Sequence, residues 1–184
     1  MLIDAFKYIL PVEENKHCSS MMFSSIIRES SNIYEIVSKT ILKKMYENVT
    51  KPNIHDFVFL SKKLKLNSVK IESSLLNPLS KSEKNLLKPF QKIESGEIEK
   101  PEWWNAYNKI KHSPNSTKEH ATLLNAISSL AAANIIITKY LGPGVVLGTL
   151  FKPKEQDGKL LFEIINIQTS KLFTTSTNSF SFDL

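Results

Sequence analysis

The chain has 184 residues, with 24 Lys and Arg residues against 18 Asp and Glu residues and a formal net charge of +6. Of the basic side chains, 23 are lysines and one is an arginine, Arg28. Because a lysine ammonium does not reproduce the planar guanidinium fork, this composition excludes sites that need several arginines from one chain. The single cysteine, Cys18, excludes a disulfide framework and suits a reducing compartment, so we expect a cytoplasmic protein.

Two predicted helices occupy the N-terminal third of the chain. Ser19 or Ser20 can cap a helix that runs to about Asn48, along which apolar residues recur at helical spacing. A Thr-Lys-Pro segment interrupts this pattern. Asn53 can then cap a second helix that runs to about Leu66.

The positive charge is concentrated in this part of the chain. Residues 39–70 contain eight lysines against Glu47 and Asp56, whereas basic and acidic residues balance in the remainder. A lysine-rich surface attracts polyanions without regard to their sequence. The alternative is that these lysines keep two exposed helix faces soluble. The candidates for nucleic-acid binding here are Lys43, Lys44, Lys62 and Lys63.

Residues 67–100 are punctuated by prolines and a glycine and are predicted to form a long connection. Val69 and Ile71 alternate briefly, and a short helix is expected from Ser80 or Ser82 to Leu87. A connection of this length inside a compact domain is often functional or contains a further element.

Two more helices are predicted after this connection. Pro101 suits the first helical position of a third helix, which ends near Ser113. Ser116 and Glu119 form a capping box at the start of a fourth, which runs to Leu141 and contains three consecutive alanines that would let a neighbouring helix approach closely. Asparagine and serine recur along this apolar helix, so we expect a buried core helix and no membrane span.

The C-terminal part of the chain changes character. Residues 145–152 and 159–168 are rich in β-branched and apolar side chains and flank an Asp-Gly turn signal, which predicts a β-hairpin with one more strand and a tail after it. We therefore expect one mainly α domain over residues 1–184. An up-and-down helical bundle would span residues 17–141, and a small β-hairpin appendage residues 145–184.

The third predicted helix carries the one motif with evident chemistry, WWNAYNKIKH. Trp104, Asn108 and His112 are spaced by four residues and share one face. The helix dipole favours the protonated imidazole of His112, and Lys109 and Lys111 would hold a phosphate beside it. This combination suits acid–base chemistry on a phosphodiester. The alternative is a solvated histidine at a helix end.

The aromatic and apolar residues of this helix are more readily explained by packing than by chemistry. Trp103, Tyr107 and Ile110 form a second stripe that is expected to pack inward. Trp104 is a candidate to stack on a base, although adjacent tryptophans more often divide between a core and a dimer interface.

The metal-capable side chains of the chain give no convincing site. Glu13, Glu14, His17 and Cys18 lie close together in the sequence, but they lack a second cluster of ligands. We therefore expect no metal site and no cofactor.

The motif WWNAYNKIKH, followed by a long Ala/Leu/Asn helix, resembles bacterial branches of the HEPN superfamily that carry a Trp-Trp, Tyr-Asn and Lys-His signature at this spacing. The resemblance covers about residues 19–141 as a helical pattern and is specific over residues 103–112. It implies an all-α up-and-down bundle, commonly a homodimer. Many members are metal-independent ribonucleases in defence or toxin–antitoxin systems, and others have lost catalysis and bind nucleic acid or protein.

The family's active motif is an arginine, a polar residue and, a few residues later, a histidine, and two copies meet across the dimer. His112 matches the histidine and Asn108 the polar residue. The arginine position falls on Tyr107, and Asn105 or Ala106 would occupy it at longer spacings. Arg28 would have to be supplied by the first helix, where an ion pair with Glu29 is the alternative use. Without the motif arginine, charge stabilisation would rest on the two lysines of the motif, a weaker arrangement.

The sequence thus predicts an RNA-engaging, HEPN-like homodimer of a prokaryotic cytoplasm, linked to phage defence or stress response. The sequence does not decide whether the protein is an active ribonuclease, because the motif arginine is absent. The alternative is a non-catalytic helical module that dimerises or binds a partner protein, with the C-terminal appendage as the contact. The candidate catalytic residues are His112, Asn108 and Tyr107, and the candidate nucleic-acid-binding residues are Lys109, Lys111, Trp104, Lys43, Lys44, Lys62 and Lys63.

Overall fold

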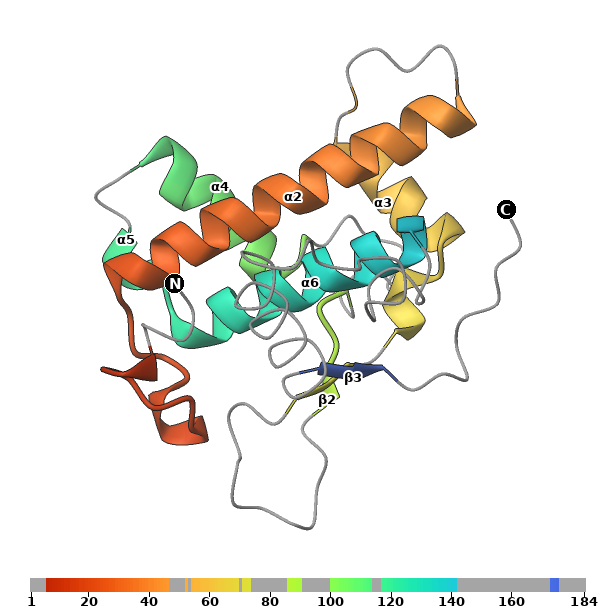
Figure 1. Cartoon of the computed structure of the whole chain (residues 1–184). Helices are drawn as coiled ribbons and strands as arrows, with labels where there is room; N and C mark the ends of the chain where they lie inside the picture. The colour runs from red at the N-terminus through yellow and green to blue at the C-terminus, as the bar shows by residue number, and fades with distance from the viewer. Residues whose placement is uncertain are drawn as a thin grey trace, which may run out of the picture.

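The computed structural model describes residues 6–46, 52, 54–69, 71–73, 86–90, 100–113, 117–141 and 173–175. This part of the chain is mainly helical and forms a bundle, as predicted (Figure 1). The helices are α2 (Met21–Met45), α3 (Ile54–Lys63), α4 (Glu102–His112), α5 (Thr117–His120) and α6 (Leu123–Leu141). The shorter elements are the 3-10 helices η1 (Glu13–Asn15) and η2 (Leu66–Ser68) and the strands β1 (Ile71–Ser73), β2 (Leu86–Leu87) and β3 (Phe173–Thr175).

The bundle is built on the contact between α2 and α6, which lie side by side (Figure 1). The hydroxyls of Ser30 on α2 and Ser129 on α6 are hydrogen-bonded at 2.8 Å, and Ala131, Ala132 and Ala133 are buried. The burial of the three alanines agrees with their predicted role, which is to let a neighbouring helix approach closely. Among the described helices, α6 alone is long and apolar enough to cross a membrane. However, 56% of its apolar 18-residue segment is buried inside the protein, as in a core helix.

The segment before α2 closes the N-terminal end of α6. The backbone N–H of Leu123 donates to the carbonyl of Cys18, and that of Leu124 donates to the carbonyl of Lys16. The first N–H groups of a helix have no partner within the helix, so these bonds stabilise a helix that begins at Leu123. The prediction of one uninterrupted helix is therefore wrong, because α5 and α6 are separate. Its proposed cap, Ser116, lies outside the described residues.

The boundaries of the first two helices are close to those predicted. The hydroxyl of Ser20 accepts a hydrogen bond from the backbone N–H of Met22 and caps α2. The second helix ends earlier than predicted, at Lys63, because Lys65 adopts a left-handed backbone with a φ of 52°. A residue in that conformation cannot continue an α-helix, and the chain turns into η2 instead.

Tyr34 on α2 is the centre of an aromatic cluster that holds α4 on the bundle. Its ring is 3% exposed and meets Trp103 and Trp104 of α4 edge-on, with centroids 5.3 and 5.6 Å away. Phe57 of α3 and Phe90 lie 6.4 and 5.6 Å from the same ring. The burial also raises the pKa of the Tyr34 hydroxyl. Three segments distant in sequence therefore meet at one side chain.

Three short strands form an antiparallel sheet in the order β2-β1-β3, in which Ile71 lies opposite Leu87 on one side and Thr175 on the other. The prediction of a helix that ends at Leu87 is wrong at residues 86–87, which pair as a strand. Residues 74–85 lie outside the described part of the chain, as does the predicted hairpin at 145–168. The strand β3 lies after the segment of the predicted hairpin, where the sequence predicts one further strand.

Substituting Tyr34 tests whether this cluster holds the bundle together. Tyr34→Ala should lower the free energy of unfolding by about 3–5 kcal/mol, because it leaves a large cavity among packed rings. Tyr34→Phe removes only the hydrogen bond of the hydroxyl with Ser61 Oγ at 3.3 Å and should cost about 1 kcal/mol. Urea unfolding measures both changes. Tyr8→Ala, at a tyrosine that is 82% exposed, is the matched control, and an equally small loss in both alanine variants would contradict the central position of Tyr34.

Candidate functional site

The helix α4 borders a hollow of about 640 Å³ on the surface of the bundle. Apolar parts of its wall come from Phe57 and Trp104, and Glu102 is the acidic residue in the lining. The remaining polar side chains of the lining are amides, lysines and one imidazole: Lys100, Asn105, Asn108, Lys109, His120 and Asn125. Such a lining offers both hydrogen-bonding groups and positive charge to a ligand.

The three asparagines of the hollow are held in place by the backbone. Each side-chain NH2 group donates to a carbonyl four or five residues earlier: Asn105 to Lys100 at 3.3 Å, Asn108 to Trp104 at 3.0 Å and Asn125 to His120 at 3.0 Å. An amide group has a second N–H and an acceptor oxygen besides. The amides are therefore oriented in advance and retain hydrogen-bonding capacity for a bound molecule.

Sequence reasoning did not place His120 and Asn125 in this site. His120 ends the four-residue helix α5, and its side chain is 25% exposed, with Nε2 3.9 Å from the carboxylate of Glu119. Asn125 lies in the first turn of α6. Both come next to α4 through tertiary packing, and helical periodicity relates only residues of the same helix. No local sequence signal places them beside Asn108.

The motif residues of α4 divide between the hollow and its surroundings. Trp104, Asn108 and Lys109 line the hollow, whereas His112 ends the helix with an exposed side chain and is not part of the lining. Trp104 is 8% exposed and packs against the rings of Tyr34, Phe57 and Tyr107. The aromatic cluster thus takes up most of this ring, which leaves little of it for a base. The inward stripe Trp103, Tyr107 and Ile110 is buried, as predicted.

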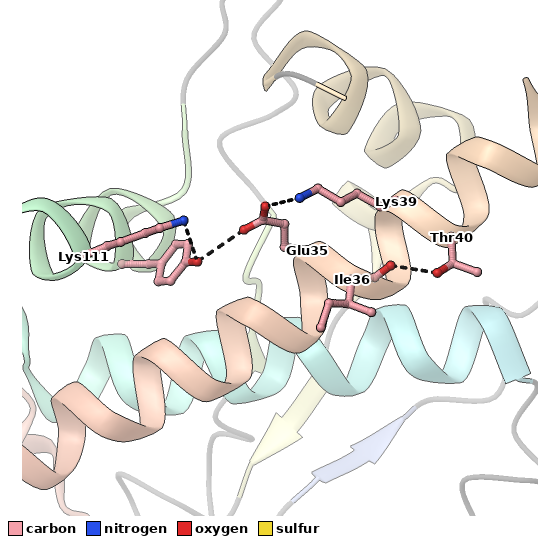
Figure 2. A network of polar contacts seen from close by, with 6 residues as sticks. Glu35, Ile36, Lys39, Thr40 and Lys111 are labelled. Carbon is pink, nitrogen blue, oxygen red and sulfur yellow. Dashed lines mark hydrogen bonds and ion pairs between the residues drawn. The ribbon is translucent and has the colours of Figure 1, made fainter. Parts of the chain in front are cut away.

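A polar network joins Glu35 and Lys39 of α2 to Lys111 of α4 (Figure 2). It includes Tyr107, the residue at the expected position of the motif arginine. Its hydroxyl donates to Glu35 Oε2 at 3.3 Å and accepts a hydrogen bond from Lys111 Nζ at 3.4 Å, while Lys39 pairs with the other oxygen of Glu35. Burial on its own would raise the pKa of Glu35. The hydrogen bond and charge of Lys39, with the charge of Lys111, outweigh burial and hold this pKa below its ordinary value. Tyr107 therefore links α4 to α2 through Glu35, and Lys111 bonds to the Tyr107 hydroxyl beside it.

Four of the lysines predicted to bind nucleic acid lie at the C-terminal ends of α2 and α3. Lys43 and Lys44 lie in the last turn of α2, and Lys62 and Lys63 in the last turn of α3, all four with exposed side chains. The ammonium of Lys44 lies 4.9 Å from the centre of the Tyr140 ring on α6. These four described lysines thus place positive charge on the surface at the C-terminal ends of α2 and α3.

The metal-capable side chains and Arg28 form no functional site in the described part of the chain. There, no group of three His, Cys, Asp or Glu side chains is placed to hold a metal ion. Glu13 forms an ion pair with Lys16. Arg28 is exposed on α2, and its guanidinium forms no ion pair with Glu29.

Comparisons of the chain with protein-family models, with curated proteins and with solved structures find no match. The resemblance to the HEPN superfamily therefore depends on the residues of α4 themselves.

The network around Glu35 predicts a pH dependence of stability. The pKa of Glu35 is lowered from 4.5 in the folded protein, so its carboxylate stabilises the fold at neutral pH, and this contribution is lost as the pH falls through the folded pKa. In Glu35→Gln, the stability lost between neutral pH and about pH 3.5 should be smaller than in the wild type. Urea midpoints at the two pH values measure this difference.

The matched control for this measurement is Glu29→Gln, an exposed glutamate on the same helix. It should keep the wild-type dependence of stability on pH. If Glu35→Gln also keeps that dependence, Glu35 does not stabilise the packing of α4 on α2.

Proposed function

We propose that this chain is a HEPN-like helical protein of a prokaryotic cytoplasm that binds RNA at the hollow along α4, as a homodimer that serves phage defence or stress response. The observation that carries the proposal is that the hollow is built on the helix with the HEPN-like motif, since Asn108 and Lys109 line it. Its oriented asparagine amides suit the edges of unpaired bases, and Lys100 and Lys109 suit phosphate oxygens. RNA offers both kinds of group.

The proposal assigns binding and does not include cleavage. The motif position of the arginine is Tyr107, whose hydroxyl is bonded to Glu35 and Lys111. No guanidinium of α4 would stabilise the charge on a scissile phosphate, and a lysine is a weaker substitute. If cleavage occurred, it would be independent of metal and would depend on the exposed imidazole of His112.

Charge removal at the hollow tests the proposal. Lys109→Gln should weaken the binding of a labelled single-stranded RNA about 3- to 10-fold at fixed salt, because the variant lacks one charge-assisted hydrogen bond to a phosphate. Fluorescence anisotropy measures the affinity. Lys118→Gln removes the same charge from an exposed lysine of α5 outside the hollow lining and should change the affinity less than about 2-fold.

Three outcomes of this experiment decide between the alternatives. Equal reductions of affinity in Lys109→Gln and Lys118→Gln would mean that RNA responds only to net charge. RNA cleavage in the presence of a chelator that disappears in His112→Ala would restore the catalytic interpretation. Absence of any salt-sensitive RNA binding would contradict the proposal and favour an interaction module.

One observation favours that second candidate function. Ile33 and Ile36 on α2 are 41% and 55% exposed and lie one turn apart, beside the half-buried Val37. Exposed branched apolar side chains that cluster on a helix are typical of protein contacts. A second copy of the chain or a partner protein that covers this face would bury them. This function predicts that the chain binds a protein and does not bind RNA.

A further inference from the structure

We infer that the adjoining ends of α2 and α3 form a second contact surface for single-stranded RNA, on which Tyr46 and Phe59 stack against bases and the neighbouring lysines bind the phosphates. We call it the stacking surface, and it consists of Tyr46, Phe59, Lys43, Lys62 and Lys63. The inference shares with the proposed function only the class of ligand. Its evidence comes from residues that do not line the hollow.

The two aromatic residues are exposed, and their rings pack against each other. Tyr46 directly follows α2, and its ring meets that of Phe59 on α3 edge-on, with centroids 5.9 Å apart and an interplanar angle of 64°. As whole residues, Tyr46 and Phe59 are 38% and 47% exposed, whereas Phe57, two residues before Phe59, is buried in the core. Rings already held by packing lose little conformational freedom when a base stacks on them.

Exposed lysines lie on the same helical segments as these rings. Lys62 and Lys63 follow Phe59 by three and four residues on α3 and therefore share its face of the helix. Lys43 lies in the last turn of α2, just before Tyr46. Lysines in the last turn of a helix also complement its dipole, which accounts for their position but not for the exposed aromatic rings between them.

The electrostatics of the neighbouring residues agree with a strongly positive surface. Lys139, near the end of α6, has a pKa lowered first by burial and then by the charge of Lys65, so these two ammonium groups repel each other. The one acidic residue of α3 is Asp56. On α2, Glu35 is the acidic residue nearest to this end, and it is paired with Lys39. The described residues at these ends of α2 and α3 therefore carry more positive than negative charge.

Exposed aromatic residues together with lysines favour single-stranded RNA as the ligand. The bases of a duplex are stacked on one another and cannot reach exposed rings, whereas unpaired bases stack on aromatic side chains while lysines follow the backbone. An acidic membrane surface would use the lysines but would not require a π-face on the protein. The role of the ring faces is therefore the decisive test.

Replacement of the rings by leucine tests this role. Tyr46→Leu/Phe59→Leu keeps apolar side chains but removes both π-faces, and it should weaken binding of a labelled oligouridine of about 12 nucleotides by about 10-fold or more. Phe59→Trp should retain wild-type affinity. Tyr8→Leu, at an exposed tyrosine outside the surface, is the matched control. Unfolding in urea checks that each variant is folded.

Salt dependence supplies the second readout. Lys62→Gln/Lys63→Gln should reduce the slope of log affinity against log salt by about 0.7 for each phosphate that the variant no longer neutralises, whereas the leucine variant should keep the wild-type slope. Wild-type RNA affinity in the leucine variant would overturn the inference. So would binding to phosphatidylserine vesicles that depends on these lysines while RNA binding is unaffected by the ring substitutions.

The hollow and the stacking surface fail in different ways. If the proposed function fails and the inference holds, Lys109→Gln binds as the wild type does and the leucine variant does not. If the inference fails and the proposed function holds, Lys109→Gln binds RNA more weakly than the wild type, and the leucine variant binds RNA as the wild type does. Reduced affinity in both variants supports both, and absence of RNA binding by the wild type overturns both.

Discussion

The edge-on packing of Trp103 and Trp104 on Tyr34 is the interaction on which the position of α4 depends. This helix has only 11 residues, too few to be stable in water without tertiary packing. Its buried rings supply that packing, and the indole N–H of Trp103 also donates to the carbonyl of Pro89 at 2.9 Å. This packing of α4 determines where the hollow lies. It also determines the positions of the network around Glu35 and of the exposed helix end at His112.

The aromatic attachment explains why one short motif serves two purposes. Tyr107 binds Glu35 of α2 and accepts a hydrogen bond from Lys111, whereas Asn108 and Lys109 line the hollow. A tyrosine at the position of the motif arginine therefore strengthens the bundle and adds no charge to a site. The tyrosine at this expected position is the reason that we propose a protein that binds RNA through amides, lysines and exposed aromatic residues, without an arginine-based catalytic centre.

Local patterns predicted what depends on neighbours in the sequence, and long-range packing decided the rest. The inward stripe of α4 follows from helical spacing alone, and it is buried as expected. The deep burial of Trp104 depends on rings from α2 and α3, and the break before α6 depends on carbonyls of Lys16 and Cys18, which are distant in the sequence. His120 joins the hollow in the same way. Neither spacing nor composition carries such information.

The central claim is that RNA binds in the hollow along α4. Titration of the 15N-labelled chain with a short single-stranded RNA tests it directly, because the side-chain NH2 groups of Asn105, Asn108 and Asn125 give their own NMR signals. We predict that these signals shift with added RNA while that of Asn134, which is hydrogen-bonded to Thr138 on α6, stays in place. Unchanged signals from all three asparagines of the hollow at saturating RNA would contradict the claim.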